Sequence, residues 1–346
     1  MAAARLANTP LSVLDLAHLR EGGTPSDAFH NSLALAQHVE RLGYKRFWLA
    51  EHHNIRGVAC SATSVLIGYV AGGTSTIRVG SGGVMLPNHA PLVIAEQFGT
   101  LESLYPGRID LGLGRAPGGD VSATRALRRD WRGTGDDFPE LLEELRAYLG
   151  APGGQQRVHA YPGEDTNIPI WLLGSSGYSA QLAGMLGLPF AFAAHFQPDP
   201  LHAALRLYRS SFRPSNVLQK PHVMVAIPIL VADTDERARF LATTPQQMFL
   251  NLIRDTPGPL PKPVAEIDWT TGEMALVSAK LRAAIIGGPQ TVRARLDAFL
   301  EETQPDELMV VCNTFDFPDR LHSFRLLADL AGMPARTLRA EPPAAI

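Results

Sequence analysis

Two kinds of segment alternate along the chain. Short runs of apolar or β-branched residues recur, and most are continuously apolar, which is typical of parallel strands covered on both faces. Longer stretches with apolar positions every three or four residues separate them and predict amphipathic helices. We predict strands at residues 11–16, 46–51, 77–86, 108–114, 170–173, 190–194, 222–230 and 307–311.

Capping residues mark several helix starts between these strands. Ser26 is a suitable N-cap for the first helix, and Pro91 and Pro289 stand where a first-turn proline is tolerated. A strand followed by a helix, repeated eight times, is the pattern of a (β/α)8 TIM barrel. We therefore predict an α/β fold with a single barrel domain over residues 1–346.

Two segments are longer than an ideal barrel requires. Residues 116–169 form an insertion after the fourth strand, and residues 243–280 follow the seventh and include the proline-rich stretch 257–263. Because both follow strands, both are expected over the C-terminal mouth of the barrel. A long insertion of this kind is either a lid or a surface excursion, and we predict a lid for residues 243–280.

Composition excludes several classes of protein. The net charge is −3, from 31 basic and 34 acidic residues, and no block of like charge stands out, so neither a nucleic acid nor a membrane surface is an expected partner. The cysteines, Cys60 and Cys312, lie too far apart to suggest a disulfide framework or a zinc site. No signal-peptide core or membrane span is visible, so a cytoplasmic protein is expected.

The stretch from Phe47 to Asn54 carries the clearest chemistry. A predicted strand runs into Glu51, His52 and His53, and neighbouring strand side chains point to opposite faces, so the chain must leave the sheet here. Barrel enzymes do their chemistry at this end of their strands, and imidazole exchanges protons near neutral pH. The two histidines could equally serve only as hydrogen-bonding groups. Adjacent histidines do not readily share one ion, so no metal site is predicted.

Residues 170–180 read as a strand, a turn of small residues and a helix start. A helix start presents unpaired backbone N–H groups and the positive end of the helix dipole. Gly174 and Gly177 leave room for a phosphate, and Ser175 and Ser176 could donate hydrogen bonds to it. Ordinary capping by serine is the alternative. We favour an anion site.

Three other places along the predicted strands carry candidate residues. Arg115 could supply a fixed cation for a phosphate, or a salt bridge at the barrel rim. Gly82 and Gly83 interrupt a strand pattern, which indicates that another group approaches the backbone closely, either a planar ring or a packed helix. His195 and Phe196 end the sixth strand and are expected to line the mouth.

The order of these motifs resembles that of the bacterial luciferase-like, flavin-dependent oxidoreductases. The resemblance covers nearly the whole chain and rests on residues 48–53, 79–91, 105–119, 174–176 and 286–289. It implies a (β/α)8 barrel that holds FMN at its C-terminal mouth. An ordered set of motifs is more specific than any one of them.

The resemblance also implies roles for individual residues. Arg115 and the turn at residues 174–176 match the phosphate-binding positions of the family. Gly82 and Gly83 match a non-proline cis peptide bond beside the flavin ring. His52 matches a histidine that serves as a base near the flavin, while His53 is expected at the mouth with the substrate.

The activity implied is that of an FMN-dependent monooxygenase, which uses reduced FMN and O2 to oxidise a small organic substrate away from water. A separate NAD(P)H-dependent flavin reductase is an expected partner, because no second nucleotide motif is visible. The alternatives are an FMN- or F420-dependent reductase or dehydrogenase, or a non-catalytic flavin-binding protein. Family members commonly pair, so a homodimer through residues 62–71 and 92–104 is expected, although a face buried against the barrel would explain the same apolar residues.

Overall fold

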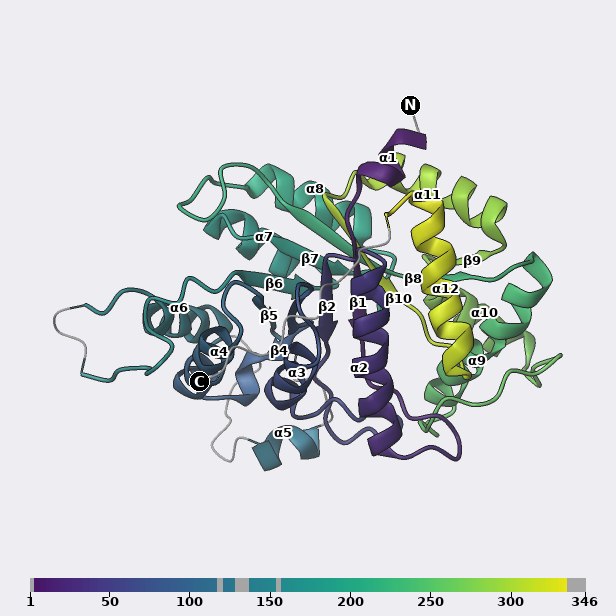
Figure 1. Ribbon diagram of the computed structural model, residues 1–346, viewed down its shortest axis with the longest axis horizontal. Coiled ribbons are helices and arrows are strands. Elements are labelled where there is room, and N and C mark those ends of the chain that lie inside the picture. Colours follow the sequence, from purple (N-terminus) through teal and green to yellow (C-terminus); the bar gives the residue numbers. More distant parts are fainter. Residues whose placement is uncertain (1–2, 117–120, 128–136, 154–156, 335–346) are drawn as a thin grey trace.

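The strands of this chain close into a parallel barrel, as the computed structural model shows for residues 3–116, 121–127, 137–153 and 157–334 (Figure 1). The strands found in these ranges are β1 (Leu11–Asp15), β2 (Arg46–Leu49), β3 (Arg78–Ser81), β4 (Val84–Met85), β5 (Ile109–Gly114), β6 (Ile170–Gly174), β7 (Phe190–Ala193), β8 (Val223–Val231), β9 (Ile285–Gly287) and β10 (Glu307–Val311). Their order is β10-β1-β2-β3-β5-β6-β7-β8, and β8 pairs back onto β10, all in parallel. The predicted eight-stranded barrel is confirmed.

Helices surround the barrel, with α2 and α12 side by side on the face turned toward the viewer (Figure 1). The helices are α1 (Ala3–Asn8), α2 (Pro25–Arg41), α3 (Thr63–Gly72), α4 (Pro91–Leu104), α5 (Val121–Leu127), α6 (Phe138–Leu149), α7 (Gly177–Leu186), α8 (Leu201–Ser211), α9 (Asp235–Ile253), α10 (Thr271–Lys280), α11 (Pro289–Thr303) and α12 (Phe317–Leu330), with a 3-10 turn η1 (Leu86–Asn88). No helix within the described ranges combines the length and apolar character that crossing a membrane requires.

The start of α2 corrects one expectation. The N-cap is Thr24 rather than Ser26: the Thr24 hydroxyl accepts from the backbone N–H of Asp27, and the Asp27 carboxylate accepts from the backbone N–H of Thr24. Pro25 then takes the first helical position, which suits a residue without an N–H. Ser26 is already inside the helix.

Two strand predictions also need correction. The expected strand at residues 77–86 is divided into β3 and β4, and the division falls at Gly82 and Gly83. The short strand β9 was not predicted; it extends the sheet beside the end of β8, where Ile229 pairs with Ile285. Three residues are too few to give a readable pattern of apolar positions.

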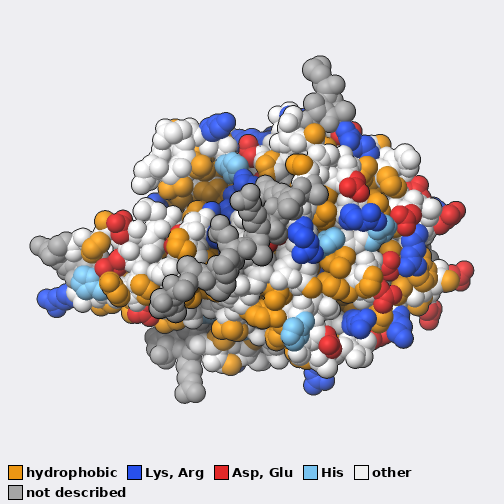
Figure 2. All heavy atoms as spheres, viewed as in Figure 1, with side chains coloured by type: hydrophobic (Ala, Val, Ile, Leu, Met, Phe, Trp, Pro, Cys, Tyr) orange, Lys and Arg blue, Asp and Glu red, His pale blue; other side chains and the backbone are white. Residues whose placement is uncertain are grey.

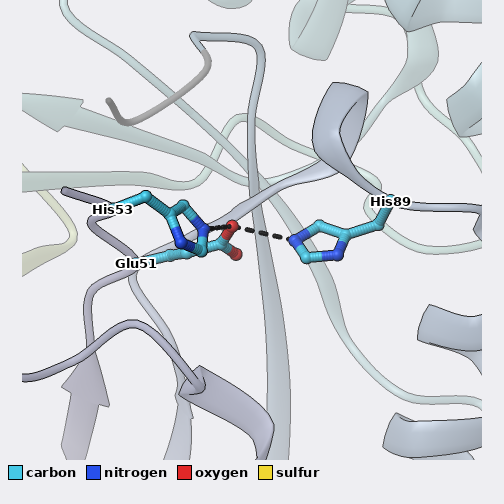
Figure 3. A group of neighbouring side chains, drawn as sticks. All are labelled: Glu51, His53 and His89. Carbon is cyan, nitrogen blue, oxygen red and sulfur yellow. Dashed lines mark hydrogen bonds and ion pairs between the residues drawn. The ribbon is translucent and has the colours of Figure 1, made fainter. Parts of the chain in front are cut away.

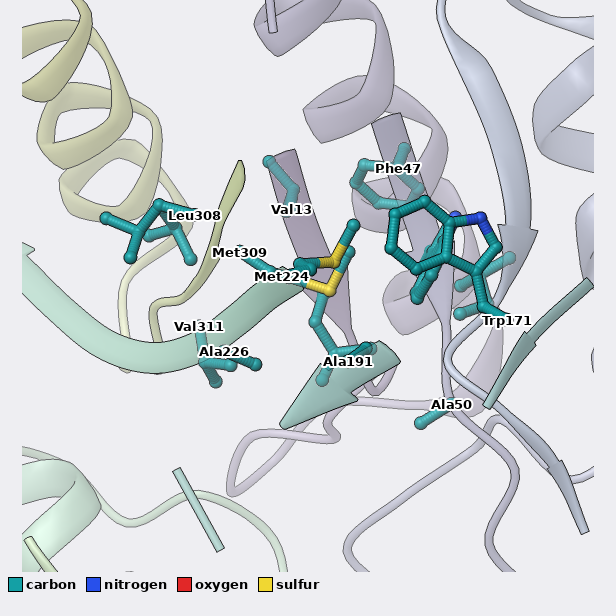
Figure 4. Close-up of a cluster of buried hydrophobic side chains, with 14 of the residues drawn as sticks. Val13, Phe47, Ala50, Trp171, Ala191, Met224, Ala226, Leu308, Met309 and Val311 are labelled. Atoms are coloured by element: carbon teal, nitrogen blue, oxygen red, sulfur yellow. The ribbon is translucent and has the colours of Figure 1, made fainter. Parts of the chain in front are cut away.

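The barrel interior is filled by side chains. Figure 4 shows Met224 and Met309 packed together, with Phe47 and Trp171 beside them. Trp171 also meets Trp48 edge to face, with ring centroids 5.4 Å apart. These side chains are almost completely buried. A filled barrel leaves its two ends, and the loops over them, as the places for a ligand.

Buried ion pairs close the N-terminal end of the barrel. Arg46, on β2, bridges Asp110 on β5 (Nη1 to Oδ2, 2.6 Å) and Glu307 on β10 (Nε to Oε1, 2.9 Å). Arg78 reaches the other oxygen of Asp110 at 2.7 Å, and the Trp48 indole donates to Asp110 at 3.1 Å. Charges without this mutual pairing would be costly to bury. The network therefore fixes the relative positions of four strands at the end opposite the mouth.

The proline-rich segment lies against the loop after β1. Leu260 exchanges backbone hydrogen bonds with this loop, donating to the carbonyl of Leu19 at 2.7 Å and accepting from the N–H of Glu21 at 3.0 Å. The Thr244 hydroxyl, on α9, donates to the carbonyl of Pro261 at 3.0 Å. The segment is thus anchored at the rim of the mouth. Opening and closing of residues 243–280 stays a prediction.

Candidate active site

The chain leaves the sheet directly after β2, as the adjacent histidines indicated. The backbone N–H of His52 donates to the carbonyl of Cys60 at 3.1 Å, and the Thr63 hydroxyl donates to the carbonyl of Ala50 at 3.0 Å. Asn54 has a left-handed backbone with φ of 58°, a conformation that asparagine tolerates well. This turn presents its side chains at the mouth of the barrel.

Glu51 joins two histidines from separate segments (Figure 3). Its Oε1 atom accepts from Nε2 of His53 at 2.8 Å and from Nε2 of His89 at 2.8 Å. Its Oε2 atom accepts from the backbone N–H of Met85, at the end of β4, at 3.1 Å. The side chain of Glu51 is buried, so the three bonds replace water around its carboxylate.

These bonds decide the charge of Glu51. Burial acts to raise its pKa, but hydrogen bonds from His53, His89 and the Met85 amide prevail and lower the pKa to about 2. Glu51 is therefore ionised and can only accept, so both imidazoles carry their proton on Nε2. The three side chains also have the spacing of a metal site, with ligand atoms within 4.8 Å of one another. In the structure, however, the Nε2 proton of each imidazole already faces a lone pair of the Glu51 carboxylate.

Three imidazoles at the mouth each have a buried ring nitrogen with no hydrogen-bond partner in the described structure. They are His18 (Nε2), His52 (Nδ1) and His195 (Nδ1), which follow β1, β2 and β7. A buried polar atom without a partner costs about 1–3 kcal/mol. Three of them at one end of the barrel indicate a place built for a polar ligand.

All three imidazoles are held neutral. Burial lowers the pKa of His18 and of His195 to about 4 in each case. Burial also lowers the pKa of His52, against the opposing influence of the Glu51 carboxylate. Nδ1 of His18 lies 3.3 Å from the carbonyl oxygen of Gly57, which can only accept, so this ring offers Nε2 as an acceptor.

The residues of the predicted anion site lie near the start of α7. The guanidinium of Arg115, which follows β5, stacks over the ring of Tyr178 with its Cζ 4.2 Å from the ring centroid. Ser176 is the N-cap of α7, but among the described residues no side-chain hydrogen bond caps the helix there. Gly174 has no room for a side chain, since a Cβ would lie 2.7 Å from Cβ of Ser179. A cation and uncapped N–H groups thus share one corner of the mouth.

The peptide bond between Gly82 and Gly83 is cis. A Cβ on Gly83 would lie 2.7 Å from the carbonyl oxygen of Gly112 on β5, and one on Gly82 would lie 2.6 Å from Cδ1 of Leu14. Packing against neighbouring strands therefore explains both glycines without a ligand, and the helix expected as an alternative neighbour is not involved. Their contact with a flavin ring stays a prediction.

The remaining predicted mouth residue, Phe196, is 62% exposed. Nζ of Lys280 lies 5.6 Å from its ring centroid and also donates to the side-chain carbonyl of Gln197 at 3.2 Å. Lys280 ends α10, so the inserted segment reaches the mouth here. Of the other insertion, residues 117–120, 128–136 and 154–156 lie outside the described ranges.

Sequence reasoning missed two members of this site, His18 and Tyr178, and gave no partner to a third, His89. His18 could have been recognised as a histidine that lies three positions after the end of the first strand. His89 was visible as a polar residue after the third strand, but nothing in the sequence pointed to Glu51 as its partner. Tyr178 stood inside the predicted anion turn, where only its small neighbours were considered.

The chain is similar to several known proteins. The family model of luciferase-like monooxygenases matches residues 9–307. A protein of Escherichia coli (strain K12) named luciferase-like monooxygenase is 53% identical over 321 residues, 92% of this chain and 96% of that protein. The uncharacterized protein YvbT of Bacillus subtilis (strain 168) is 58% identical over 326 residues, 93% of this chain and 97% of that protein.

Solved structures share the fold. The crystal structure of apo-MsnO8 is 35% identical, with a TM-score of 0.86, and the alignment covers 95% of this chain and 100% of that one. More remote structures include the oxygenating constituent of 3,6-diketocamphane monooxygenase in complex with FMN (18% identity, TM-score 0.73) and an F420-dependent secondary alcohol dehydrogenase (14% identity, TM-score 0.70). The chain belongs to the luciferase-like monooxygenase family.

Proposed function

We propose that this protein is an FMN-dependent monooxygenase, which uses reduced FMN and O2 to oxidise a small organic substrate. The observation that carries the proposal is that two features share one mouth. The Arg115 cation lies beside the start of α7, and neutral imidazoles have buried ring nitrogens that no described residue binds. An anionic tail and a polar ring edge are the two parts of FMN that such groups would bind.

In this proposal the described residues divide the binding of FMN between them. Arg115 and the backbone of residues 175–177 would bind the phosphate, and Tyr178 would support the Arg115 guanidinium. Gly82 and Gly83 would lie along the ring, because neither presents a side chain. When bound, the flavin supplies the reducing electrons with which O2 is activated.

His52 would handle the proton. Its neutral imidazole can accept a proton at a free nitrogen, and burial keeps it in that form. Phe196, α10 and the proline-rich segment would exclude water from the mouth. His195 supplies a second free ring nitrogen, which suits a polar group of the substrate.

The candidate functions differ in the cofactor that they use. Family members use FMN or F420. The closely related E. coli protein is named a monooxygenase, whereas the F420-dependent dehydrogenase shares only 14% identity, and this difference favours FMN with O2. A reductase or dehydrogenase using FMN or F420 is the second candidate, and a flavin-binding protein without activity is the third.

We also propose a homodimer through α3 and α4. Hydrophobic side chains gather at the surface over α3 (Figure 2), where Val65 is 69% exposed and Tyr69 39%. On the adjacent α4, Val93 is 42% and Leu104 62% exposed. A paired surface would cover them. Reduced FMN would come from a separate NAD(P)H-dependent reductase in the cytoplasm, a compartment that suits the free cysteines.

The proposal is tested by loading the purified protein with reduced FMN or reduced F420 without oxygen and then mixing it with O2. We expect FMN to bind, and the oxidised-flavin absorbance to return in two phases as the protein delays the reaction's final step. A single-phase return as fast as that of free flavin would support the reductase or dehydrogenase. Binding of neither cofactor would contradict the proposal.

A further inference from the structure

The Glu51 carboxylate connects two segments whose relative position the proposed FMN site depends on. One is the turn that carries His52 and His53, directly after β2. The other follows the cis peptide and includes Met85 and His89. Glu51 accepts one hydrogen bond from its own turn and two from the other segment.

We propose that Glu51 is a positioning residue, a buried carboxylate that holds His52 and the Gly82–Gly83 backbone at a fixed separation. This inference rests on the proposed function, since it concerns the same site. A loop held by a single bond could shift, but three charge-assisted bonds to one carboxylate fix both segments. Because Oε1 receives two N–H groups and Oε2 a third, only an ionised carboxylate satisfies all three donors.

The charge of Glu51 also affects the pKa of His52. The titratable groups that act on His52 are Glu51 and His53 from its own turn, His18 from the loop after β1, and His195 from the end of β7. Glu51 is the one that favours the protonated form of His52. Removing its charge therefore lowers the pKa of His52 further.

A bound metal ion is the competing explanation for Glu51, His53 and His89. The spacing would permit it, but each Nε2 proton already points at Oε1, and a metal would have to displace both. The observed hydrogen bonds therefore favour the positioning role of Glu51. Titration with Zn2+ is therefore part of the test.

The test compares Glu51→Gln with Glu40→Gln. Glu40, near the end of α2, is as buried as Glu51, 2% exposed, and also accepts hydrogen bonds from backbone N–H groups. Its donors are Ser75, Thr76 and Ile77, which directly precede β3 at the other end of the barrel. Glutamine at position 51 turns one acceptor into a donor and must lose at least one of the three bonds. We expect kcat to fall by about 10- to 100-fold, since small misplacements of reacting groups cost this much.

The pH profile separates positioning from general damage. His52 acts unprotonated, so activity falls as the pH drops through its pKa, and in Glu51→Gln this acid limb should move to lower pH. Glu40→Gln should lose stability while its acid limb and FMN affinity stay unchanged. In 15N-histidine-labelled wild-type protein, His53 and His89 should both be Nε2–H tautomers, and Glu51→Gln should disturb these signals.

Several outcomes would overturn the inference. An unchanged acid limb and FMN affinity in folded Glu51→Gln would remove Glu51 from the site. Tight one-to-one binding of Zn2+ that Glu51→Gln abolishes would assign the cluster to a metal. If wild-type protein binds no FMN, the proposed function fails, but the tautomer measurement still tests whether His53 and His89 are held by Glu51.

Discussion

Replacing His52 by alanine is expected to slow oxidation by about 10²- to 10⁴-fold, the usual contribution of a positioned general acid or base. The reason is local: His52 is the neutral imidazole whose backbone is fixed by Cys60, and its Nδ1 atom is buried without a partner in the described structure. FMN affinity should change little, because the phosphate would be held at Arg115. Turnover and FMN binding are measured on the same preparation.

The matched control is His202→Ala, in α8. His202 is an exposed histidine whose Nε2 lies 3.3 Å from Oε1 of Glu302, so its loss should leave turnover unchanged. Turnover that survives in His52→Ala at the wild-type rate would remove His52 from the chemistry. The wild-type rate itself should persist below pH 6.5, since burial lowers the pKa of His52, and should fall once the pH passes below that pKa.

Replacing Asp110 by alanine is expected to destabilise the fold by about 3–5 kcal/mol, because the buried guanidinium of Arg46 loses one of its two carboxylate partners and Arg78 loses the carboxylate it binds. Asp110 binds Arg46 at 2.6 Å and Arg78 at 2.7 Å, and Arg46 is only 7% exposed. Denaturation by urea, followed by circular dichroism, measures the change in the free energy of unfolding.

The variant Asp199→Ala tests whether burial of the ion pairs causes the loss of stability expected for Asp110→Ala. Asp199 pairs with Arg282 at 2.6 Å, a distance equal to that of the buried pair, but both side chains are more than half exposed. Such a pair contributes about 0–1 kcal/mol. Equal losses of stability in the two variants would contradict the structural role given to the buried network.

The barrel could be predicted from sequence because its strands are buried on both faces and therefore read as continuous apolar runs. The turn at His52 and His53 was equally visible, since the alternation of a strand forbids two adjacent buried imidazoles. The cap of α2 was predictable but was misassigned: Thr24, Pro25 and Asp27 form the full capping pattern. The strand β9 was too short to read.

Pairings across the barrel could not be predicted in this way. Glu51 and His89 are 38 positions apart, and their contact depends on the path of the chain after the third strand. Asp110 and Arg46 meet only because β2, β3 and β5 take one particular register. A single sequence shows which residues are polar in an apolar run, but their partners follow from the register of the sheet.

The central claim is that an anionic tail is bound between Arg115 and the start of α7. It is tested most directly by titrating wild-type protein and Arg115→Ala with FMN and with riboflavin, which lacks the phosphate, and following flavin fluorescence. We expect wild-type protein to bind FMN at least about tenfold more tightly than riboflavin, the factor that a charge-assisted hydrogen bond provides. Arg115→Ala should lose most of this preference. Equal affinity of wild-type protein for the two flavins would contradict the account.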